Sequence, residues 1–384
     1  MPDYADRIQR ARDAMQRQGV DLLYLAPGAN AQYLSGWRRN RPHFGNVNYP
    51  GGWIQGLFLG LRAGPVLVVP RMVAEFDLEP NTTLEVRVLP DRGDPRAFLD
   101  SMLREFEPRL GAVAVENRAW SEQLLNLRQL RPDLEVRVAS DVVAPLRMIK
   151  EPEELQAMQA AADIVDRTMS DIISFLQPDS GQTELDVANE IDRLMVKHGA
   201  DGSSFVTNVW QMGPGEERPL AMKASRRRLE RGNSLSFDFG STLDGYCYDF
   251  GRSVHLGEAS DEYRRVHALV MRAAEVGIRA LCDERYTAEE VDALARQVIV
   301  DGGYGEWFRH RLGHGIGLDV HEPPYLDRGD MSRLKRNMCF TVEPSIFIPG
   351  RFGARTEDVV VVGGEQGGRL LTRYRRDLQV VASR

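Results

Sequence analysis

Hydrophobic positions in the first part of the chain follow two different spacings. The opening segment MPDYADRIQRARDAMQRQG has the apolar spacing of an amphipathic helix, and helical patterns recur near residues 95–110 and 120–130. Short apolar runs alternate with these helices and predict β-strands at residues 21–26, 56–61, 65–70, 85–89, 112–116 and 134–138. Such alternation predicts a small mixed-sheet α/β domain.

The hydrophobic pattern changes near residue 145. A long amphipathic helix begins soon after it, with Pro152 in the first turn and acidic residues next to it, as helix N-termini prefer. We therefore place a domain boundary there, between an N-terminal α/β domain of residues 1–145 and a C-terminal domain of residues 146–384.

An internal repeat appears in the C-terminal domain. Residues 181–199 and residues 286–303 each contain a threonine suited to cap a helix, an early glutamate, an apolar helical stripe and a glycine. In each case a helical pattern precedes the repeat and strand-like sequence follows it. Two such helix–helix–strand halves would pack face to face, and the cleft between them would suit a binding site.

Composition excludes some classes of function without naming one. The chain has 384 residues, of which 42% are hydrophobic and 27% charged, ordinary values for a globular protein. Its formal charge of -7 disfavours a general nucleic-acid binder, which would carry a basic surface. Three scattered cysteines are too few for a disulfide framework and fit a reducing cytoplasm. With no signal-peptide pattern and no membrane-length apolar run, we predict a cytoplasmic protein without a membrane partner.

Acidic residues interrupt several apolar strand patterns in the C-terminal domain. The segment 233–254 (NSLSFDFGSTLDGYCYDFGRSV) predicts two strands joined by a turn at Asp244-Gly245, and these strands carry Asp238 and Asp249. A carboxylate inside an apolar strand is costly unless it is paired or bound to metal. Either aspartate alone could instead face solvent at a strand edge.

Two later strand patterns contain further acidic residues. The segment NMCFTVEPSIFI, residues 337–348, places Glu343 at the end of an apolar strand. The segment GARTEDVVVVGG, residues 353–364, places Glu357 and Asp358 at the start of another. We therefore expect carboxylates from four strand patterns in this domain.

Three of the seven histidines lie close together in the segment FRHRLGHGIGLDVHEPP. A single buried histidine is usually a hydrogen-bonded core residue, but His310, His314 and His321 together favour a metal or proton-transfer site. One imidazole joined to four carboxylates would make an oxygen-dominated site that suits Mn²⁺, Co²⁺ or Zn²⁺. Bridging carboxylates would hold two such ions close together, an arrangement that activates water for hydrolysis.

With these motifs in this order, the chain resembles the pita-bread metallopeptidase family, which includes methionine aminopeptidase, aminopeptidase P, prolidase and the metal-free hydrolase creatinase. The resemblance covers essentially the whole chain, including the linker-like segment RMIKEPEEL. It implies an α/β (α+β) fold, in which a small N-terminal creatinase-type domain precedes a C-terminal pita-bread domain of pseudo-twofold helix–helix–strand halves. It also implies two divalent metal ions per chain, with the ligands Asp238, Asp249, His314, Glu343 and Glu357.

The resemblance also implies an activity, the metal-dependent hydrolysis of an amide (C–N) bond by an Xaa-Pro dipeptidase or aminopeptidase. In that family the glutamate corresponding to Glu343 is also the general base. The histidine corresponding to His321 contacts the substrate and the tetrahedral intermediate. The metal and this histidine would stabilise the developing oxyanion.

His310 and Arg355 match positions that line the substrate site of the proline-specific members of the family. Alternatives stay open for both residues. His310 could support the site without touching the substrate, and Arg355 could be a structural partner of Asp358 or Glu357. We expect Cys247, which lies between the two metal aspartates, to be a buried packing residue and not a ligand.

One position departs from the family pattern. Seventeen residues before the first metal aspartate the family has a further histidine, whereas this chain has Ala221. The substrate is therefore open between an Xaa-Pro peptide and another small C–N compound, as in creatinase and ectoine hydrolase. A non-catalytic binding protein on the same fold is a third hypothesis, which the complete set of metal ligands disfavours.

A partner subunit is also expected. The long segment 37–53, rich in arginine, asparagine, proline and glycine, lies between the first two predicted strands. In creatinase the small domain of one subunit borders the site of the other. By resemblance, we predict a homodimer in which this segment reaches the neighbouring metal cleft, with Arg41 and His43 as candidate substrate contacts.

Overall fold

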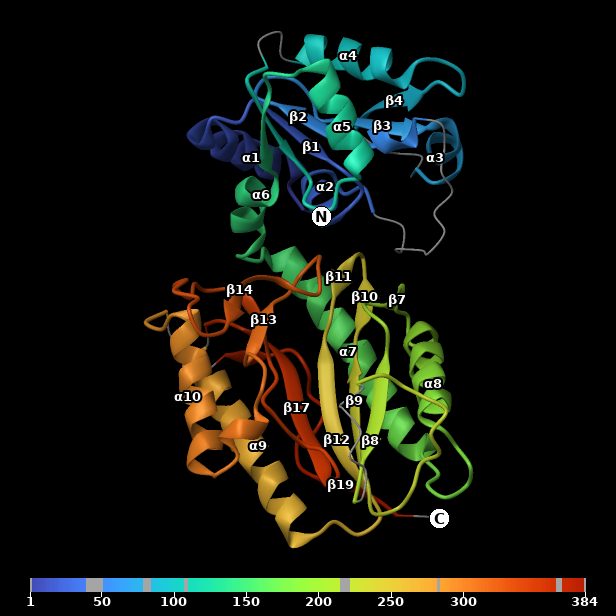
Figure 1. The fold of residues 1–384 in the computed structure, drawn as a ribbon, viewed down its shortest axis with the longest axis vertical. Coiled ribbons are helices and arrows are strands. Elements are labelled where there is room, and N and C mark those ends of the chain that lie inside the picture. The colour runs from blue at the N-terminus through green and yellow to red at the C-terminus, as the bar shows by residue number, and fades with distance from the viewer. Residues whose placement is uncertain are drawn as a thin grey trace. The chain divides into compact units, whose positions relative to one another are not determined.

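The computed structural model divides the chain into two compact units, residues 1–147 and 148–384 (Figure 1). The residues that it describes are 2–38, 51–78, 84–106, 110–214, 222–281, 284–363 and 368–382. None of the helices in these ranges combines the length and the apolar character needed to cross a membrane.

The N-terminal unit is built on a six-stranded mixed sheet in the order β4-β3-β2-β1-β5-β6. β2 runs antiparallel to its neighbours, and the other pairs are parallel. The strands are β1 (Leu22–Leu25), β2 (Gly56–Gly60), β3 (Val66–Pro70), β4 (Glu85–Leu89), β5 (Ala112–Val115) and β6 (Glu135–Val138). The helices are α1 (Tyr4–Gln18), α2 (Ala29–Ser35), η1 (Gly52–Ile54), α3 (Arg71–Phe76), α4 (Pro95–Phe106), α5 (Ser121–Leu130) and α6 (Ser140–Arg147). Every strand predicted from the apolar runs is therefore present.

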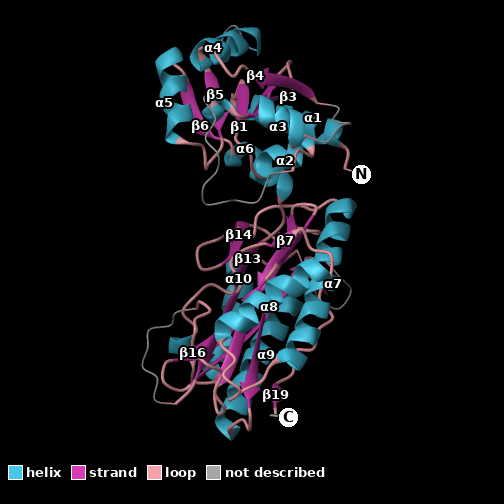
Figure 2. Cartoon of the chain, turned by 90° about the vertical axis from the view of Figure 1, so that its right-hand side faces the viewer, coloured by secondary structure: helices cyan, strands magenta, loops and turns pink. Residues whose placement is uncertain are grey.

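The C-terminal unit packs helices α7 to α10 beside a ten-stranded sheet in the described part of the chain. Figure 1 shows α7 and α8 on one side of this unit and α9 and α10 on the other, and Figure 2 shows α7 and α8 lying side by side. The helices are α7 (Pro152–Phe175), α8 (Glu184–Lys197), α9 (Asp261–Ala280), α10 (Ala288–Asp301) and η2 (Gly305–Trp307).

The main path of the sheet is β14-β13-β15-β17-β12-β9-β8. β16 and β18 also pair with β17, β19 pairs with β12, and a smaller sheet has the order β11-β10-β7. The first strands are β7 (Gly202–Ser203), β8 (Asn208–Met212), β9 (Ser234–Phe239), β10 (Ser241–Leu243), β11 (Tyr246–Cys247) and β12 (Phe250–Leu256). The later strands are β13 (Gly313–Gly315), β14 (Glu322–Leu326), β15 (Cys339–Val342), β16 (Ser345–Ile348), β17 (Phe352–Val361), β18 (Arg369–Leu370) and β19 (Gln379–Val381).

The internal repeat corresponds to the helices α8 and α10. Thr183 caps α8 and accepts from the Asp186 amide, and Thr287 caps α10 and accepts from the Glu290 amide. In both caps the acidic side chain accepts in return from the threonine amide, which completes a capping box. The predicted helix–helix–strand halves are therefore present.

The predicted hairpin differs from the structure in one respect. Asp244 and Gly245 form its turn, with φ values of 53° and 82°, as a tight hairpin turn requires. Each arm is nevertheless divided, because β10 and β11 join β7 in the smaller sheet whereas β9 and β12 join the main sheet. A Cβ atom at Gly240, between β9 and β10, would lie 1.8 Å from the Tyr248 carbonyl oxygen, so the crossing between the sheets needs glycine.

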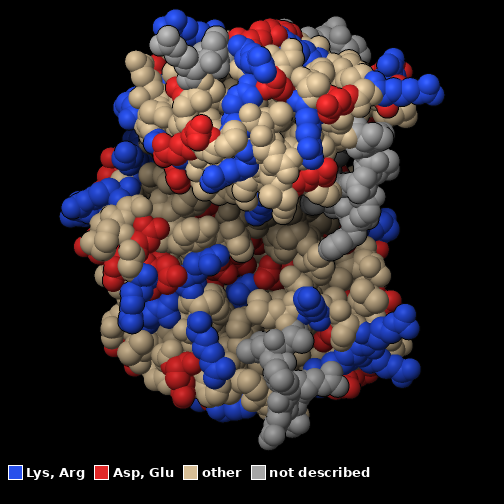
Figure 3. Space-filling model, turned by 45° about the horizontal axis from the view of Figure 1, so that its top comes forward, with Lys and Arg blue, Asp and Glu red and all other residues tan. Residues whose placement is uncertain are grey.

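Charged side chains of both signs are interspersed on the face shown in Figure 3. This mixture is the usual surface of a globular protein.

Candidate metal centre

Strand pairing brings two of the candidate ligands together across β12. Gly251 on β12 is the direct partner of Asp238 on β9 and of Glu357 on β17. A Cβ atom at Gly251 would lie 2.6 Å from Glu357 Oε2, so the absence of a side chain leaves the space that the carboxylates occupy. This residue was not among the predicted site residues, although it lies two positions after Asp249 in the segment DFG.

The other candidate ligands lie at or between strand ends. Asp249 precedes β12, His314 is the middle residue of β13, and Glu343 connects β15 to β16. Potential ligand atoms form three overlapping groups, and within each group they lie within 4.8 Å of one another. The groups are Asp249, His314 and His321; His314, Glu343 and Glu357; and Asp238, Asp249 and Glu357.

His314 directs one ring nitrogen toward the carboxylates. Its Nε2 atom lies 3.6 Å from Asp249 Oδ2 and 3.5 Å from Glu343 Oε1. Nδ1 donates to the Gly315 carbonyl at 3.0 Å, which leaves Nε2 as the acceptor of the neutral ring and matches the usual support of a metal-binding histidine. The Thr341 hydroxyl accepts from the His314 amide at 3.0 Å and donates to Glu343 at 3.3 Å. Burial lowers the pKa of His314, but the two nearby carboxylates outweigh it, and the pKa is raised.

Burial and mutual repulsion disfavour the negative charges of this cluster. Burial raises the pKa of Asp238 to about 7, with Arg355 opposing the rise and Asp249 and Glu343 adding to it. Burial also raises the pKa of Glu343, and it holds the pKa of Glu357 well above the usual range. Acidic groups held in this way need added positive charge before they ionise together.

The donor set fits divalent cations. Asp249 Oδ1 and Glu357 Oε2 are buried and accept no hydrogen bond from the residues that the structure describes. Leaving such oxygens without a partner is costly, and a bound cation would satisfy both. Four carboxylates with one imidazole are the ligands that Mn²⁺, Co²⁺ and Zn²⁺ accept.

His321 lies at the exposed edge of the cluster. Its ring centroid is 4.0 Å from that of His314, and it belongs to the ligand group that contains Asp249. The residue itself is exposed, unlike the buried His314. An incoming molecule would therefore reach His321 before the buried carboxylates.

His310 has both ring nitrogens engaged. Nδ1 donates to the Arg311 carbonyl at 2.7 Å, and Nε2 then accepts from the Ser345 hydroxyl at 2.5 Å. Burial, assisted by the charge of Arg355, lowers the pKa of His310 to about 3. These contacts favour the supporting role over proton transfer.

Arg355 lies inside the cluster. Its Nη1 atom is 2.6 Å from Asp238 Oδ2 and 3.6 Å from Glu357 Oε2. Of the two structural partners considered above, Glu357 is therefore a neighbour, whereas Asp358 binds Arg252 at 2.6 Å instead. The buried guanidinium supplies part of the positive charge that the acids require.

Several predicted residues fall outside this description. Arg41, His43 and Ala221 lie outside the described residues. Cys247 is buried, donates weakly to the Leu318 carbonyl at 3.7 Å, and belongs to none of the three ligand groups found among the described residues. Its position is that of a packing residue.

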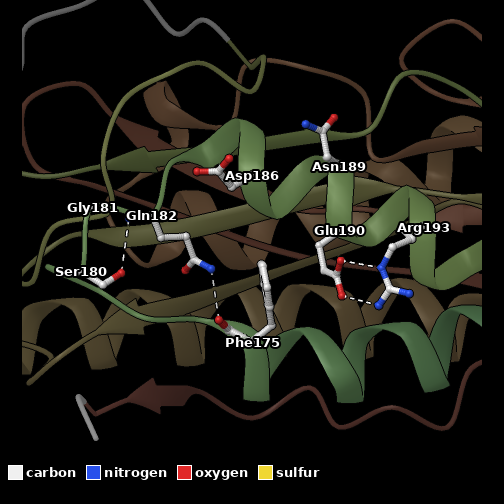
Figure 4. Close-up of a pocket in the computed structure, with 8 residues that line it drawn as sticks. All are labelled: Phe175, Ser180, Gly181, Gln182, Asp186, Asn189, Glu190 and Arg193. Atoms are coloured by element: carbon white, nitrogen blue, oxygen red, sulfur yellow. Dashed lines mark hydrogen bonds and ion pairs between the residues drawn. The ribbon is translucent and has the colours of Figure 1, made fainter.

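A surface pocket between the end of α7 and the start of α8 is lined by other residues (Figure 4). Gln182 donates to the Phe175 carbonyl at 3.1 Å, and Arg193 forms two hydrogen bonds with Glu190. These groups of the pocket therefore bond to one another in pairs, and none of the candidate ligands lines the pocket.

Comparisons with known proteins agree with this geometry. The model of metallopeptidase family M24 matches residues 156–363, and the model of the Creatinase/Prolidase N-terminal domain matches residues 7–149. The probable dipeptidase PepE of Mycobacterium tuberculosis is 34% identical over 363 residues, which cover 94% of this chain and 92% of that protein. The Xaa-Pro dipeptidase of Pyrococcus furiosus is 28% identical over 97% of this chain and 99% of its own length.

A solved structure shows the same likeness in three dimensions. The recombinant prolidase from Thermococcus sibiricus superposes with a TM-score of 0.88 at 31% sequence identity. The match covers 99% of this chain and 100% of that chain, so both units have counterparts in one protein.

Proposed function

The chain belongs to metallopeptidase family M24 and is a metal-dependent hydrolase, and we propose that it cleaves Xaa-Pro dipeptides. The observation that carries this proposal is the cluster of four carboxylates around His314, of which Asp249, Glu343 and Glu357 are buried. Dipeptidase and prolidase relatives that match over nearly the whole chain support the substrate class. The expected family and two-part fold are confirmed.

The metallopeptidases of this family use divalent metal, and we propose two ions per chain. The identity of the ions is open among Mn²⁺, Co²⁺ and Zn²⁺, which accept this mixture of oxygen and nitrogen ligands. When bound, such ions supply Lewis acidity that activates water and polarises a carbonyl group. The proposed ligands are Asp238, Asp249, His314, Glu343 and Glu357.

In the proposed reaction Glu343 accepts a proton from the attacking water. Its Oε1 atom is 3.3 Å from the Thr341 hydroxyl, and this contact supports a fixed orientation of the carboxylate. His321 hydrogen-bonds the carbonyl oxygen of the scissile amide, where negative charge develops, and its exposed position beside His314 supports this role. Arg355 borders the substrate and limits repulsion among the ligands, and Ser345 keeps His310 in a supporting position.

Hydrolysis of a panel of Xaa-Pro dipeptides by the Mn²⁺-loaded protein tests this function. Chelation should abolish release of proline, Mn²⁺ or Co²⁺ should restore it, and elemental analysis should find about two ions per chain. Asp249→Ala should remain inactive at every metal concentration. A protein that holds no metal after loading, together with Asp249→Ala acting as wild type, would refute the proposal.

A second candidate function follows from Ala221. A histidine at this position could hydrogen-bond the scissile nitrogen or the intermediate, and losing such a donor costs roughly two to four orders of magnitude in rate. We therefore keep hydrolysis of another small C–N compound as the alternative. Comparing wild type with Ala221→His on dipeptides, creatine-like and ectoine-like compounds separates the two. A wild type that cleaves dipeptides efficiently, with no gain from the histidine, excludes the alternative.

We also propose a cytoplasmic homodimer. The low cysteine content supports the compartment. Light scattering during size-exclusion chromatography tests the dimer. If the segment 37–53 acts on the neighbouring subunit, mixing Arg41→Ala chains with Asp238→Ala chains should restore activity, whereas a fully active monomer would exclude that arrangement.

A further inference from the structure

Helix α10 carries an ion pair that bonds to the main chain ahead of His314. Arg296 donates to both carboxylate oxygens of Asp292, each at 2.8 Å. The same guanidinium donates through Nη1 to the Phe308 carbonyl at 2.9 Å and through Nη2 to the His310 carbonyl at 2.7 Å. It also lies 4.1 Å from the centroid of the Phe308 ring. A planar, five-donor group can hold all these partners at once, which a lysine cannot.

Asp292 extends the connection toward the metal cluster. Its Oδ1 atom accepts from the Leu312 amide at 2.9 Å, a proton that the Leu326 carbonyl shares. The Leu312 carbonyl in turn accepts from the Glu343 amide at 2.8 Å. His314 follows Leu312 by two residues, so one buried carboxylate is linked to the main chain of two candidate ligands.

The side chain of His310 contacts the same Phe308 ring that Arg296 contacts. Its ring meets the ring of Phe308 edge-on, with centroids 5.1 Å apart. Beyond it, His310 Nε2 accepts from Ser345, two residues after Glu343. A continuous series of contacts thus runs from Arg296 through both rings to the strand that follows Glu343.

The first half of the repeat uses the same helix position for the same purpose. Asp192 is the ninth residue of α8, as Arg296 is the ninth residue of α10. Asp192 accepts from the Ser203 hydroxyl at 2.7 Å and from the Thr207 hydroxyl at 2.5 Å. In each half the ninth residue of the helix therefore bonds to the segment that leads from the helix into the sheet. The residue is acidic in α8 and basic in α10, and its partners differ.

We propose that Arg296 and Asp292 are positioning residues of the hydrolase, which hold the main chain of His310, His314 and Glu343 in the geometry that the reaction requires. This inference rests on the proposed function. The pair belongs to none of the three ligand groups found among the described residues, so it acts through the groups that it binds. A displacement of reacting groups by about 1 Å can lower a rate by roughly 100-fold, so hydrogen bonds that lie outside the site can still affect the rate strongly.

Arg296→Met removes the guanidinium group but keeps a long apolar side chain over Phe308. Arg296→Lys keeps the positive charge but not the planar set of donors. Arg193→Met is the matched control, because Arg193 forms the same kind of ion pair with Glu190 on the exposed face of α8 (Figure 4). Each full-length, Mn²⁺-loaded variant is assayed on an Xaa-Pro dipeptide below its unfolding transition. Hydrogen exchange of the amides of residues 311–314 and of Glu343 is measured in parallel.

We expect Arg296→Met to lower kcat by about 10- to 100-fold with little change in KM, and to speed exchange in both segments. Arg296→Lys should recover part of kcat, because an ammonium group can bond one of the carbonyls. Arg193→Met should match wild type in both measurements. Partial recovery by lysine distinguishes positioning from a general loss of packing.

Two results separate this inference from the proposed function. If Arg296→Met retains the wild-type kcat and exchange rates, or only unfolds at a lower temperature, the positioning role is excluded while the function stands. If wild type cleaves no Xaa-Pro dipeptide, the proposed function fails. Hydrogen exchange and Mn²⁺ titration of the same variants then decide whether the pair holds the main chain of the ligands.

Discussion

Gly251→Ala should weaken metal binding without a large change in the fold. The added Cβ atom would lie 2.6 Å from Glu357 Oε2, 2.9 Å from Arg355 Cδ and 3.0 Å from Glu357 Cβ, whereas ordinary contacts begin at 3.4 Å. Both neighbours are buried on β17, so the Glu357 carboxylate must move by most of an ångström. Overpacking of this kind costs about 1–3 kcal/mol. If the strain falls on the metal-bound geometry, Mn²⁺ affinity drops by roughly 5- to 150-fold.

Calorimetric titration of the chelator-stripped variant with Mn²⁺ measures this change, and urea unfolding reports on the fold. Gly60→Ala is the control, because Gly60 is also a strand residue but its added Cβ would meet its nearest atoms at 3.5 and 3.6 Å. Neither glycine has a left-handed φ, so backbone strain does not confuse the comparison. Wild-type Mn²⁺ affinity in Gly251→Ala would show that the space beside Glu357 is not part of a metal site.

Three further outcomes follow from buried groups. Burial, with nearby Arg252, lowers the pKa of His267 from 6.5 to about 4. The neutral side chain therefore contributes fully to stability above pH 6.5, and this contribution is lost as the pH falls toward 4. Urea unfolding should show a loss of about 3 kcal/mol over this range, which the variant His267→Gln should lack. Thr341→Val removes the hydroxyl that binds Glu343 and should destabilise the fold by about 1–3 kcal/mol and lower kcat, as urea unfolding and dipeptide assays would show. Arg252→Met removes the buried guanidinium that binds Asp358 at 2.6 Å, and only the Thr372 hydroxyl at 2.6 Å and the more distant Arg376 at 4.0 Å remain beside that carboxylate in the described structure. The change should cost about 3–5 kcal/mol in thermal unfolding, part of which a second change, Asp358→Asn, restores.

Local sequence patterns predicted the elements that carry the site. Apolar runs marked the strands of the N-terminal unit and, in the C-terminal unit, the segments that contain the four acidic ligands. A carboxylate within such a run is unusual enough to draw attention to Asp238 and Asp249. The threonine caps of α8 and α10 were recognisable because capping depends on neighbours three residues apart. The family resemblance then supplied the order of the ligands, which no single motif gives.

Contacts between distant segments were harder to predict. Gly251 matters because it pairs with Asp238 and Glu357 on two other strands, and its own neighbours in sequence do not reveal that pairing. The division of the hairpin at Gly240 likewise depends on β7, far earlier in the chain. The choice between Glu357 and Asp358 as the neighbour of Arg355 could have been made from the sequence. Alternate residues of a strand share a face, so Glu357, two residues after Arg355, lies on the same side of the strand.

The central position of β17 has a consequence for protein synthesis. Its ten residues are all buried, and it pairs with β12 on one side and β15 on the other. A nascent chain that has emerged only as far as Glu343 already contains four of the five proposed ligands, but it lacks the strand that joins their supporting strands. Activity should therefore appear late in translation, in a single step, when β17 leaves the ribosome and inserts between its two neighbours.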